Sequence, residues 1–309
     1  MKCKLCRTKK AEIFLKPYGL GLCRDDFLSF VKRRVERAID KFKMFEEKHR
    51  VLVAISGGKD SLALLHLLKG LSYDVTGYFL DLGIFPASQE AKQRILNFSK
   101  DFGISVIIDR LDEVFVATLP EIGKIMKRPP CSYCGTLKRY FFNRRGMEFD
   151  VVVTGHTLND EAASLFANNL RWDFSYMGRQ YPVLEEERGF ARKAKPLIFV
   201  SEKETAAYCF FCGIEYYEKG CPLAKGASSI FLKRKLLEID DKRPGVMYTY
   251  LKEFLDRKRK QGFMPEQKVD MRPCEECGYP TTAQGLCAVC RIRRRFVQHA
   301  EGVANNERM

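Results

Sequence analysis

The sequence predicts an α/β fold with a doubly wound, mostly parallel, Rossmann-like sheet and a small cysteine-rich module at each end of the chain. Three observations predict it. Short apolar runs alternate with segments of helical length, which is typical of parallel strands joined by helices. Glycine-rich or polar segments directly follow two of the apolar runs. Finally, pairs of cysteines in C-x-x-C spacing stand near both termini.

The sheet is expected from the apolar runs at 51–55, 75–82, 104–109 and 151–154, with helices at 62–71 and 88–102. Such short continuous runs suit strands that are buried on both faces. Outside this region the spacing predicts an amphipathic, basic helix over 27–45 and two helices within 230–260, broken near Pro244 and Gly245. We therefore expect a first module at 1–27, a catalytic domain with its linking helices at 28–265, and a ribbon with a basic tail at 266–309, whose last few residues should be disordered.

The composition is that of a soluble globular protein, with 46% hydrophobic and 30% charged residues among 309. No apolar run reaches the roughly 20 residues of a membrane span and no signal peptide opens the chain, so we expect a cytoplasmic protein that does not contact membranes. The net charge of +15 points to a polyanion such as nucleic acid, although a basic surface that binds nothing remains an alternative.

A candidate phosphate-binding loop follows the strand at 51–55. Its residues are Ser56, Gly57, Gly58, Lys59, Asp60 and Ser61. A strand, a glycine turn and a helix point backbone N–H groups and a positive helix end at one spot, and the lysine adds a mobile charge. The loop matches neither a Walker motif nor a dinucleotide fingerprint. The nucleotide-binding residues that we expect are Ala54, Ser56, Gly57, Gly58, Lys59, Asp60, Ser61 and Gly155. The alternative is a Gly-Gly turn in an ordinary α/β unit.

A second polar segment, Gly155 to Asp160, follows the strand at 151–154 and should lie at the same sheet edge. Asp60 or Asp160 could carry Mg²⁺ beside a triphosphate, since carboxylate oxygen suits that ion. The alternative is that each is only a helix cap.

Twelve cysteines in a chain of this kind favour metal sites over disulfides. Near the N-terminus the spacing favours a zinc site made by Cys3, Cys6, Cys23 and Asp26, and a metal-free tail is the alternative. Near the C-terminus, two C-x-x-C knuckles form a zinc ribbon of Cys274, Cys277, Cys287 and Cys290. An arginine-rich segment follows it and suits contact with folded RNA.

Three further cysteines form an incomplete set in the middle of the chain. Cys131 and Cys134 are paired, and Cys221 is remote from them. Three thiolates leave a coordination position open, as a catalytic metal or a [4Fe–4S] cluster requires, and the spacing does not choose between these. Lys138 lies one helical turn beyond Cys134 and should share its face.

Cys209 and Cys212 show the same spacing in a helix that opens with a capping box at Ser201 to Glu204. Apolar neighbours favour simple packing of both thiols. Additional cluster or sulfur-relay chemistry is the alternative.

S-G-G-K-D-S, P-C-x-x-C-G-x-x-K-R, G-H-x-x-x-D and a later G-C-P occur in this order over nearly the whole chain. Together with the terminal cysteine modules, they make the chain similar to the TtuA/Ncs6 group of tRNA 2-thiouridine synthetases, PP-loop ATP pyrophosphatases. Two positions depart from the group: Asn159 stands where many members have aspartate, and Asp26 replaces a more usual His or Cys.

The resemblance implies ATP bound by the loop, a [4Fe–4S] cluster on Cys131, Cys134 and Cys221, and roles for Lys138 and Asp160 near ATP, substrate or Mg²⁺. It also implies a tRNA substrate, with the T-loop uridine favoured over the wobble uridine, and a homodimer. Sulfur would come from a donor, in many relatives a ubiquitin-like thiocarboxylate protein. Two alternatives remain: a 2-thiocytidine synthetase, and a zinc-dependent RNA-binding module with a vestigial ATP site.

Overall fold

The computed structural model describes residues 1–126, 130–187, 189–223, 228–263 and 270–306. Its centre is a six-stranded sheet in the order β5-β4-β3-β6-β8-β7. The strands are β3 (Arg50–Ile55), β4 (Asp74–Asp81), β5 (Val106–Arg110), β6 (Val151–Thr154), β7 (Val183–Leu184) and β8 (Lys193–Ala194). All neighbours pair in parallel except β7, which runs antiparallel to β8. The expected α/β fold is confirmed.

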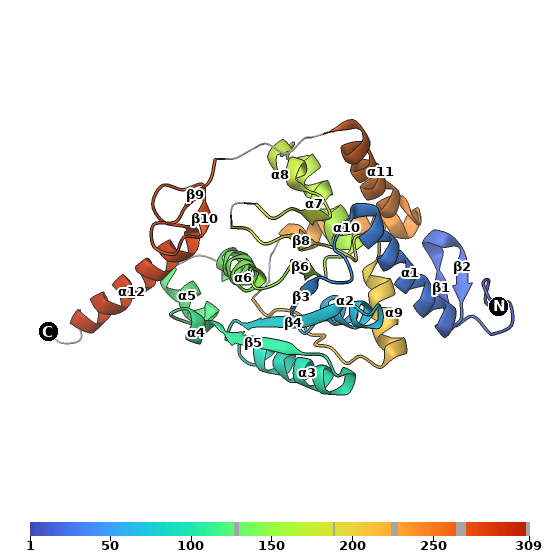
Figure 1. The fold of residues 1–309 in the computed structure, drawn as a ribbon, viewed down its shortest axis with the longest axis horizontal. Coiled ribbons are helices and arrows are strands. Elements are labelled where there is room, and N and C mark those ends of the chain that lie inside the picture. The colour runs from blue at the N-terminus through green and yellow to red at the C-terminus, as the bar shows by residue number, and fades with distance from the viewer. Residues whose placement is uncertain (127–129, 188, 224–227, 264–269, 307–309) are drawn as a thin grey trace.

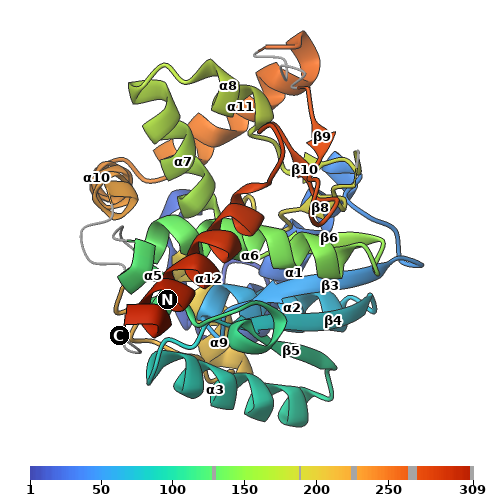
Figure 2. The same ribbon diagram turned by 90° about the vertical axis from the view of Figure 1, so that its left-hand side faces the viewer.

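Alternate residues of β3 enter two different cores, which is why the strand is apolar from Val51 to Ile55. Val51, Val53 and Ile55 pack into the larger core. Leu52 points to the opposite face, where it meets Tyr78 of β4. The first face is covered by α1 (Arg24–Phe42), α2 (Lys59–Gly70), α3 (Ala87–Phe102) and α9 (Glu202–Cys212). The second face is covered by α6 (Pro130–Gly146) (Figures 1 and 2).

A helical group stands beyond the carboxyl end of β6. It consists of α7 (Leu158–Leu170), α8 (Phe174–Arg179), α10 (Ser228–Lys242) and α11 (Val246–Gln261). The chain turns between α10 and α11 at Gly245, whose φ of +92° suits glycine. The break expected near Pro244 and Gly245 is therefore present.

The two cysteine-rich modules lie at opposite ends of the molecule (Figure 1). The N-terminal module contains the hairpin of β1 (Ile13–Leu15) and β2 (Leu20–Leu22), joined by the 3-10 helix η1 (Lys16–Tyr18). The C-terminal module contains β9 (Arg272–Pro273), β10 (Pro280–Thr281) and α12 (Ala288–Asn306), which packs on α5 (Leu119–Met126). The short α4 (Leu111–Val114) precedes α5.

The three-part division of the chain stays a proposal. The boundary expected after residue 27 falls inside α1, and Cys3, Cys23 and Phe27 belong to the main core. The boundary expected at 265 and the last three residues, expected to be disordered, lie outside the described residues. None of the described helices combines the length and apolar character that a membrane span requires.

Candidate functional site

The glycine-rich loop forms a tight turn that is closed by serine side chains. α2 begins at Lys59, three residues before the expected start at 62, because Gly58 is its N-cap and Lys59, Asp60 and Ser61 form its first turn. Ser61 Oγ accepts a hydrogen bond from the Ser56 N–H at 3.1 Å and donates one to the Gly58 carbonyl at 3.0 Å. The positive end of α2 thus lies at the carboxyl edge of β3, where an anion would bind.

Two glycines in the expected nucleotide site are fixed by space as well as by conformation. Gly57 has φ of +76°, and a Cβ there would lie 3.0 Å from Ala91 Cβ. A Cβ on Gly155 would lie 3.0 Å from both the Cα and the N of Ser61. The loop after β6 therefore lies directly against the glycine-rich loop, as the sheet topology requires. Ala54 ends its pairing with Thr154 at this same edge.

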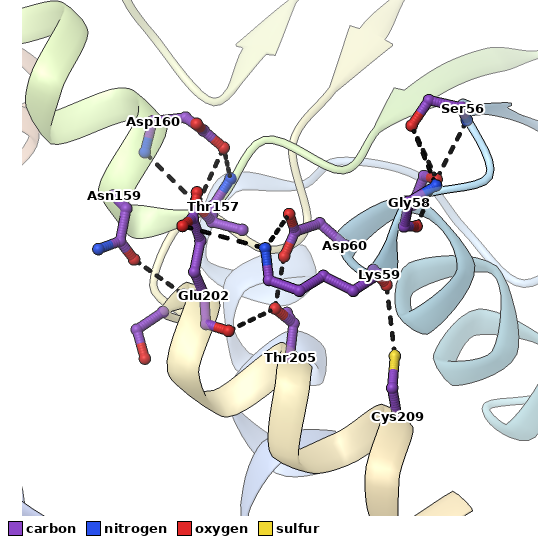
Figure 3. A network of polar contacts seen from close by, with 12 residues as sticks. Ser56, Gly58, Lys59, Asp60, Thr157, Asn159, Asp160, Glu202, Thr205 and Cys209 are labelled. Carbon is purple, nitrogen blue, oxygen red and sulfur yellow. Dashed lines mark hydrogen bonds and ion pairs between the residues drawn. The ribbon is translucent and has the colours of Figure 1, made fainter. Parts of the chain in front are cut away.

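The charged residues of the loop belong to a larger network (Figure 3). Lys59 Nζ lies 3.0 Å from Asp60 Oδ2 and 3.9 Å from Glu202 Oε2. Thr205 donates a short hydrogen bond to the other oxygen of Asp60. Glu202 and Thr205 both come from the first turns of α9, so the start of this helix forms one wall of the site.

Asp160 is both a helix cap and a residue of this site. Its Oδ2 accepts bonds of 2.9 Å from the N–H and from Oγ1 of Thr157, which completes a capping box for α7. Its Oδ1 lies 2.7 Å from Lys233 Nζ of α10. Burial opposes ionisation, but Lys233 outweighs it and lowers the pKa of Asp160. Asp160 therefore caps α7 with one oxygen and faces Lys233 in the site with the other.

Asn159 has a clear structural role at this edge. Its side chain is buried, and its Oδ1 accepts a 2.8 Å hydrogen bond from the Glu202 N–H. The amide therefore holds the start of α9 against the start of α7, and an aspartate is not needed for that contact.

Glu202, Thr205 and Lys233 are site residues that the sequence analysis missed. Glu202 was visible only as part of a capping box, and Lys233 only as one of several cations in a basic segment. The structure places Lys233 on two carboxylates of the site, Asp160 and Glu202. Only the tertiary packing of α10 on α7 reveals that position.

The three central cysteines gather at the start of α6. Cys131 lies in its first turn, and its Sγ donates to the Leu223 carbonyl at 3.1 Å, which brings the segment of Cys221 beside it. Cys131 and Cys221 are exposed and Cys134 is half-buried. Burial raises the pKa of the Cys134 thiol, nearby Lys138 opposes this, and the charges of Cys221 and Cys131 add to it. These thiols and Lys138 therefore share one electrostatic environment.

The same segment connects these cysteines to the glycine-rich loop. The Tyr217 N–H donates to the Gly57 carbonyl at 2.8 Å, at one end of the segment. Leu223 meets Cys131 at the other end. From Tyr217 to Cys221 the chain can span at most about 14 Å. The phosphate loop and the cysteines are thus close neighbours.

The terminal cysteine groups have a different geometry. In the described part of the chain, the metal-ligand side chains whose donor atoms all lie within 4.8 Å of one another form two groups, Cys3, Cys6, Cys23 and Asp26, and Cys274, Cys277, Cys287 and Cys290. The Cys6–Cys23 and Cys277–Cys287 Sγ distances are 3.9 Å and 3.8 Å. Tetrahedral zinc with Zn–S bonds of about 2.3 Å separates its sulfurs by about 3.8 Å. Each donor set therefore fits one zinc ion.

Asp26 completes the N-terminal set as an ionised carboxylate. Hydrogen bonds from the thiols of Cys3, Cys6 and Cys23 hold the pKa of Asp26 at about 2. Its Oδ2 lies 2.9 Å from Cys3 Sγ and 3.2 Å from Cys23 Sγ. The oxygen therefore occupies a corner of the group that a fourth sulfur would otherwise fill.

Cys209 and Cys212 are placed for packing. Cys209 is fully buried, and its Sγ lies 3.5 Å from the Lys59 carbonyl. Burial, together with the charge of Asp60, raises the pKa of Cys209 to about 12. Burial also raises the pKa of Cys212. Both stand at the carboxyl end of α9, where the helix dipole disfavours a thiolate. The packing alternative is favoured over sulfur relay.

Comparisons with known proteins agree with this geometry. The PP-loop domain family matches residues 30–221. A tRNA-5-methyluridine(54) 2-sulfurtransferase of Thermotoga maritima is 38% identical, over 96% of this chain and 97% of the relative. The chain belongs to the PP-loop family of tRNA 2-sulfurtransferases. A second member with the same name, from Thermus thermophilus, is 40% identical over 94% of this chain and 91% of its own length.

A solved structure confirms the fold of this PP-loop protein. The U34-tRNA thiolase NcsA from Methanococcus maripaludis, solved with its [4Fe-4S] cluster, superposes with a TM-score of 0.80. It covers 95% of this chain and 96% of its own at 22% sequence identity. At that identity the likeness concerns the fold, and the members above establish the family.

Proposed function

We propose that this protein is a tRNA 2-thiouridine synthetase that activates a uridine with ATP and replaces its C2 oxygen by sulfur. One observation carries the proposal: a single short segment contacts the phosphate loop through Tyr217 and Gly57 and the cysteines through Leu223 and Cys131. Activation of a base and delivery of sulfur to it require such a shared site. Because both relatives described above are named for uridine 54, the T-loop uridine is favoured over the wobble uridine.

In the first half of the reaction the C2 oxygen attacks the α-phosphorus of ATP and pyrophosphate leaves. The N-terminal end of α2 and the Lys59 ammonium would bind the phosphates. Asp60 and Asp160, on either side of the site, would hold Mg²⁺. In the second half sulfide attacks C2, and AMP leaves with the former uridine oxygen.

Cys131, Cys134 and Cys221 would hold a [4Fe–4S] cluster, and its fourth iron, left without a protein ligand, would bind the sulfide that the sulfur donor delivers. The geometry fits this better than it fits one zinc ion, because the three cysteines do not form one of the 4.8 Å ligand groups among the described residues. Lys138, near Cys134, would offset the negative charge that builds up during phosphate chemistry.

The terminal groups would each hold one structural zinc ion. The arginines at the start of α12 would contact the phosphates of tRNA next to the ribbon; these are Arg291, Arg293, Arg294 and Arg295. The cysteine-rich composition suits a reducing cytoplasm. The sulfur donor, such as a ubiquitin-like thiocarboxylate protein, and the homodimer belong to this proposal as well.

The test is anaerobic reconstitution with iron and sulfide, followed by reaction with unmodified tRNA and ATP. We expect ATP-dependent 2-thiouridine in digested tRNA by mass spectrometry. 2-Thiocytidine in its place would favour the alternative synthetase. Absence of pyrophosphate release in the presence of tRNA would favour an RNA-binding module instead.

A further inference from the structure

The network around the phosphate loop contains a second lysine with the same surroundings as Lys59. Lys59 pairs with Asp60, and Lys233 pairs with Asp160. Glu202 joins the two pairs, because each of its carboxylate oxygens faces one of the lysines. Both ammonium groups therefore face the same carboxylate, at the edge where phosphate would bind.

We propose that Lys233 is a phosphate-binding residue of the nucleotide site, which Asp160 and Glu202 hold in position for ATP. This inference rests on the proposed function, since it requires the glycine-rich loop to bind a nucleotide. It adds to that site a residue from outside the glycine-rich loop and the G-H-x-x-x-D segment, carried on α10.

The exposure of the group supports a ligand-facing role. The side chains of Lys233 and Glu202 are each 26% exposed, and that of Asp160 is 30% exposed. A phosphate can therefore reach the Lys233 ammonium from solvent. The two carboxylates account for two of the three N–H donors of the ammonium, and the third is suited to a phosphate oxygen.

The charge of the group also fits a phosphate accompanied by a divalent ion. Three carboxylates, Asp60, Asp160 and Glu202, surround two ammonium groups. When Mg²⁺ attracts the Asp160 or Asp60 oxygens, the lysines lose part of their counter-charge and gain attraction for the triphosphate. Burial disfavours the charged lysine, yet Asp160 and Glu202 hold the pKa of Lys233 above its ordinary value. It is thus a cation at neutral pH.

Neighbouring Lys235 offers a matched control. It lies on the same helix two residues away, is exposed, and pairs with Glu238 at 2.9 Å, outside the network. Substitution there changes the net charge of the protein by the same amount without touching the site.

The experiment measures binding of an ATP analogue with a non-cleavable α,β-bridge, and of adenosine, to the zinc-loaded full chain by calorimetry with Mg²⁺ present. We expect Lys233→Met to weaken analogue binding by about tenfold or more, the usual size for a lost charge-assisted hydrogen bond. Adenosine binding should not change. Lys233→Arg should recover part of the loss, and Lys235→Met should match the wild type.

Unchanged analogue affinity in Lys233→Met, or an equal loss for adenosine and analogue, would overturn the inference in favour of a structural salt bridge. If Lys233→Met does not fold, as judged by circular dichroism, the Lys233→Arg and Lys233→Gln variants decide by the same comparison. Failure of the wild type to bind the analogue at all would instead refute the proposed nucleotide site, so the two failures are distinguishable.

Discussion

The cysteine groups at the ends of the chain and at its centre all contain C-x-x-C pairs, but they form different sites. The terminal groups each bring four donor atoms within 4.8 Å, and three of the four C-terminal ligands are buried. The central group has three cysteines, of which Cys131 and Cys221 are exposed. A closed set of four ligands suits a structural ion, whereas an open set of three leaves a position for chemistry. Spacing alone therefore does not distinguish a structural metal site from a reactive one, but the number and the exposure of the ligands do.

The surroundings of the terminal and the central cysteine groups also differ. Hairpins and turns enclose the terminal groups, and backbone N–H groups point at their sulfurs, as at Cys274 and Cys287. The central cysteines lie instead beside Lys138 and next to the phosphate loop. We expect loss of a terminal ligand to affect folding and loss of a central ligand to affect chemistry.

The largest effect should follow Cys221→Ala. With one of three ligands removed, the cluster should not assemble, and thiolation should fall by about 100-fold or more, to background. Iron content and thiolated nucleoside are the measurements, and zinc content should stay unchanged. Cys212→Ala, which removes a thiol outside the site, is the control. Full thiolation activity in Cys221→Ala would break the distinction between the two kinds of group.

Lys138→Ala should separate assembly of the cluster from catalysis at the central cysteines. The cysteines remain, so iron loading should be normal, while turnover should fall by about 100-fold because a nearby positive charge is lost. Single-turnover kinetics and the cluster's visible absorbance measure the two properties. Lys138→Arg should restore part of the rate. Loss of iron in Lys138→Ala would show that this lysine supports the cluster rather than the reaction.

Cys274→Ala should have the converse effect. One zinc ion per chain should be lost and the C-terminal module should open, because structural zinc couples binding to folding. Limited proteolysis should then cleave near the ribbon, while binding of a non-cleavable ATP analogue should stay within about twofold of the wild type. A large loss of nucleotide affinity would mean that the two regions are not independent.

The smallest effect concerns Cys209, which belongs to a C-x-x-C pair but lies in neither a terminal nor the central cysteine group. Burial raises the pKa of its thiol to about 12, so the thiol is neutral at pH 8. The stabilisation that the buried neutral thiol provides is lost only as the pH rises above the thiol pKa of the unfolded chain towards 12. In zinc-loaded protein without the cluster at pH 8, iodoacetamide should label exposed Cys131 and Cys221 within minutes and Cys209 only after unfolding, as mass spectrometry would show. Early labelling of Cys209 would support sulfur-relay chemistry.

Much of the fold and of the candidate site could be predicted from the sequence, because the patterns that indicate them are local. Five apolar residues before a glycine-rich turn predict β3 and the phosphate loop, and C-x-x-C pairs predict metal ligands. The start of α2 was expected three residues too late, since the loop residues themselves form its first turn. Glu202 and Lys233 could not be found, because their role depends on how α9 and α10 pack against α7. The contact that joins Tyr217 to Gly57 is equally invisible from spacing.

The central claim is that nucleotide and cluster share one site, and the reduced cluster offers a direct reporter of it. Electron paramagnetic resonance spectra of the reconstituted, reduced protein should be recorded with and without a saturating non-cleavable ATP analogue and Mg²⁺. We predict that the analogue shifts the cluster's g-values, because the Tyr217 to Leu223 segment connects its binding loop to the ligands. Superimposable spectra, at analogue concentrations where calorimetry shows full occupancy, would contradict the claim.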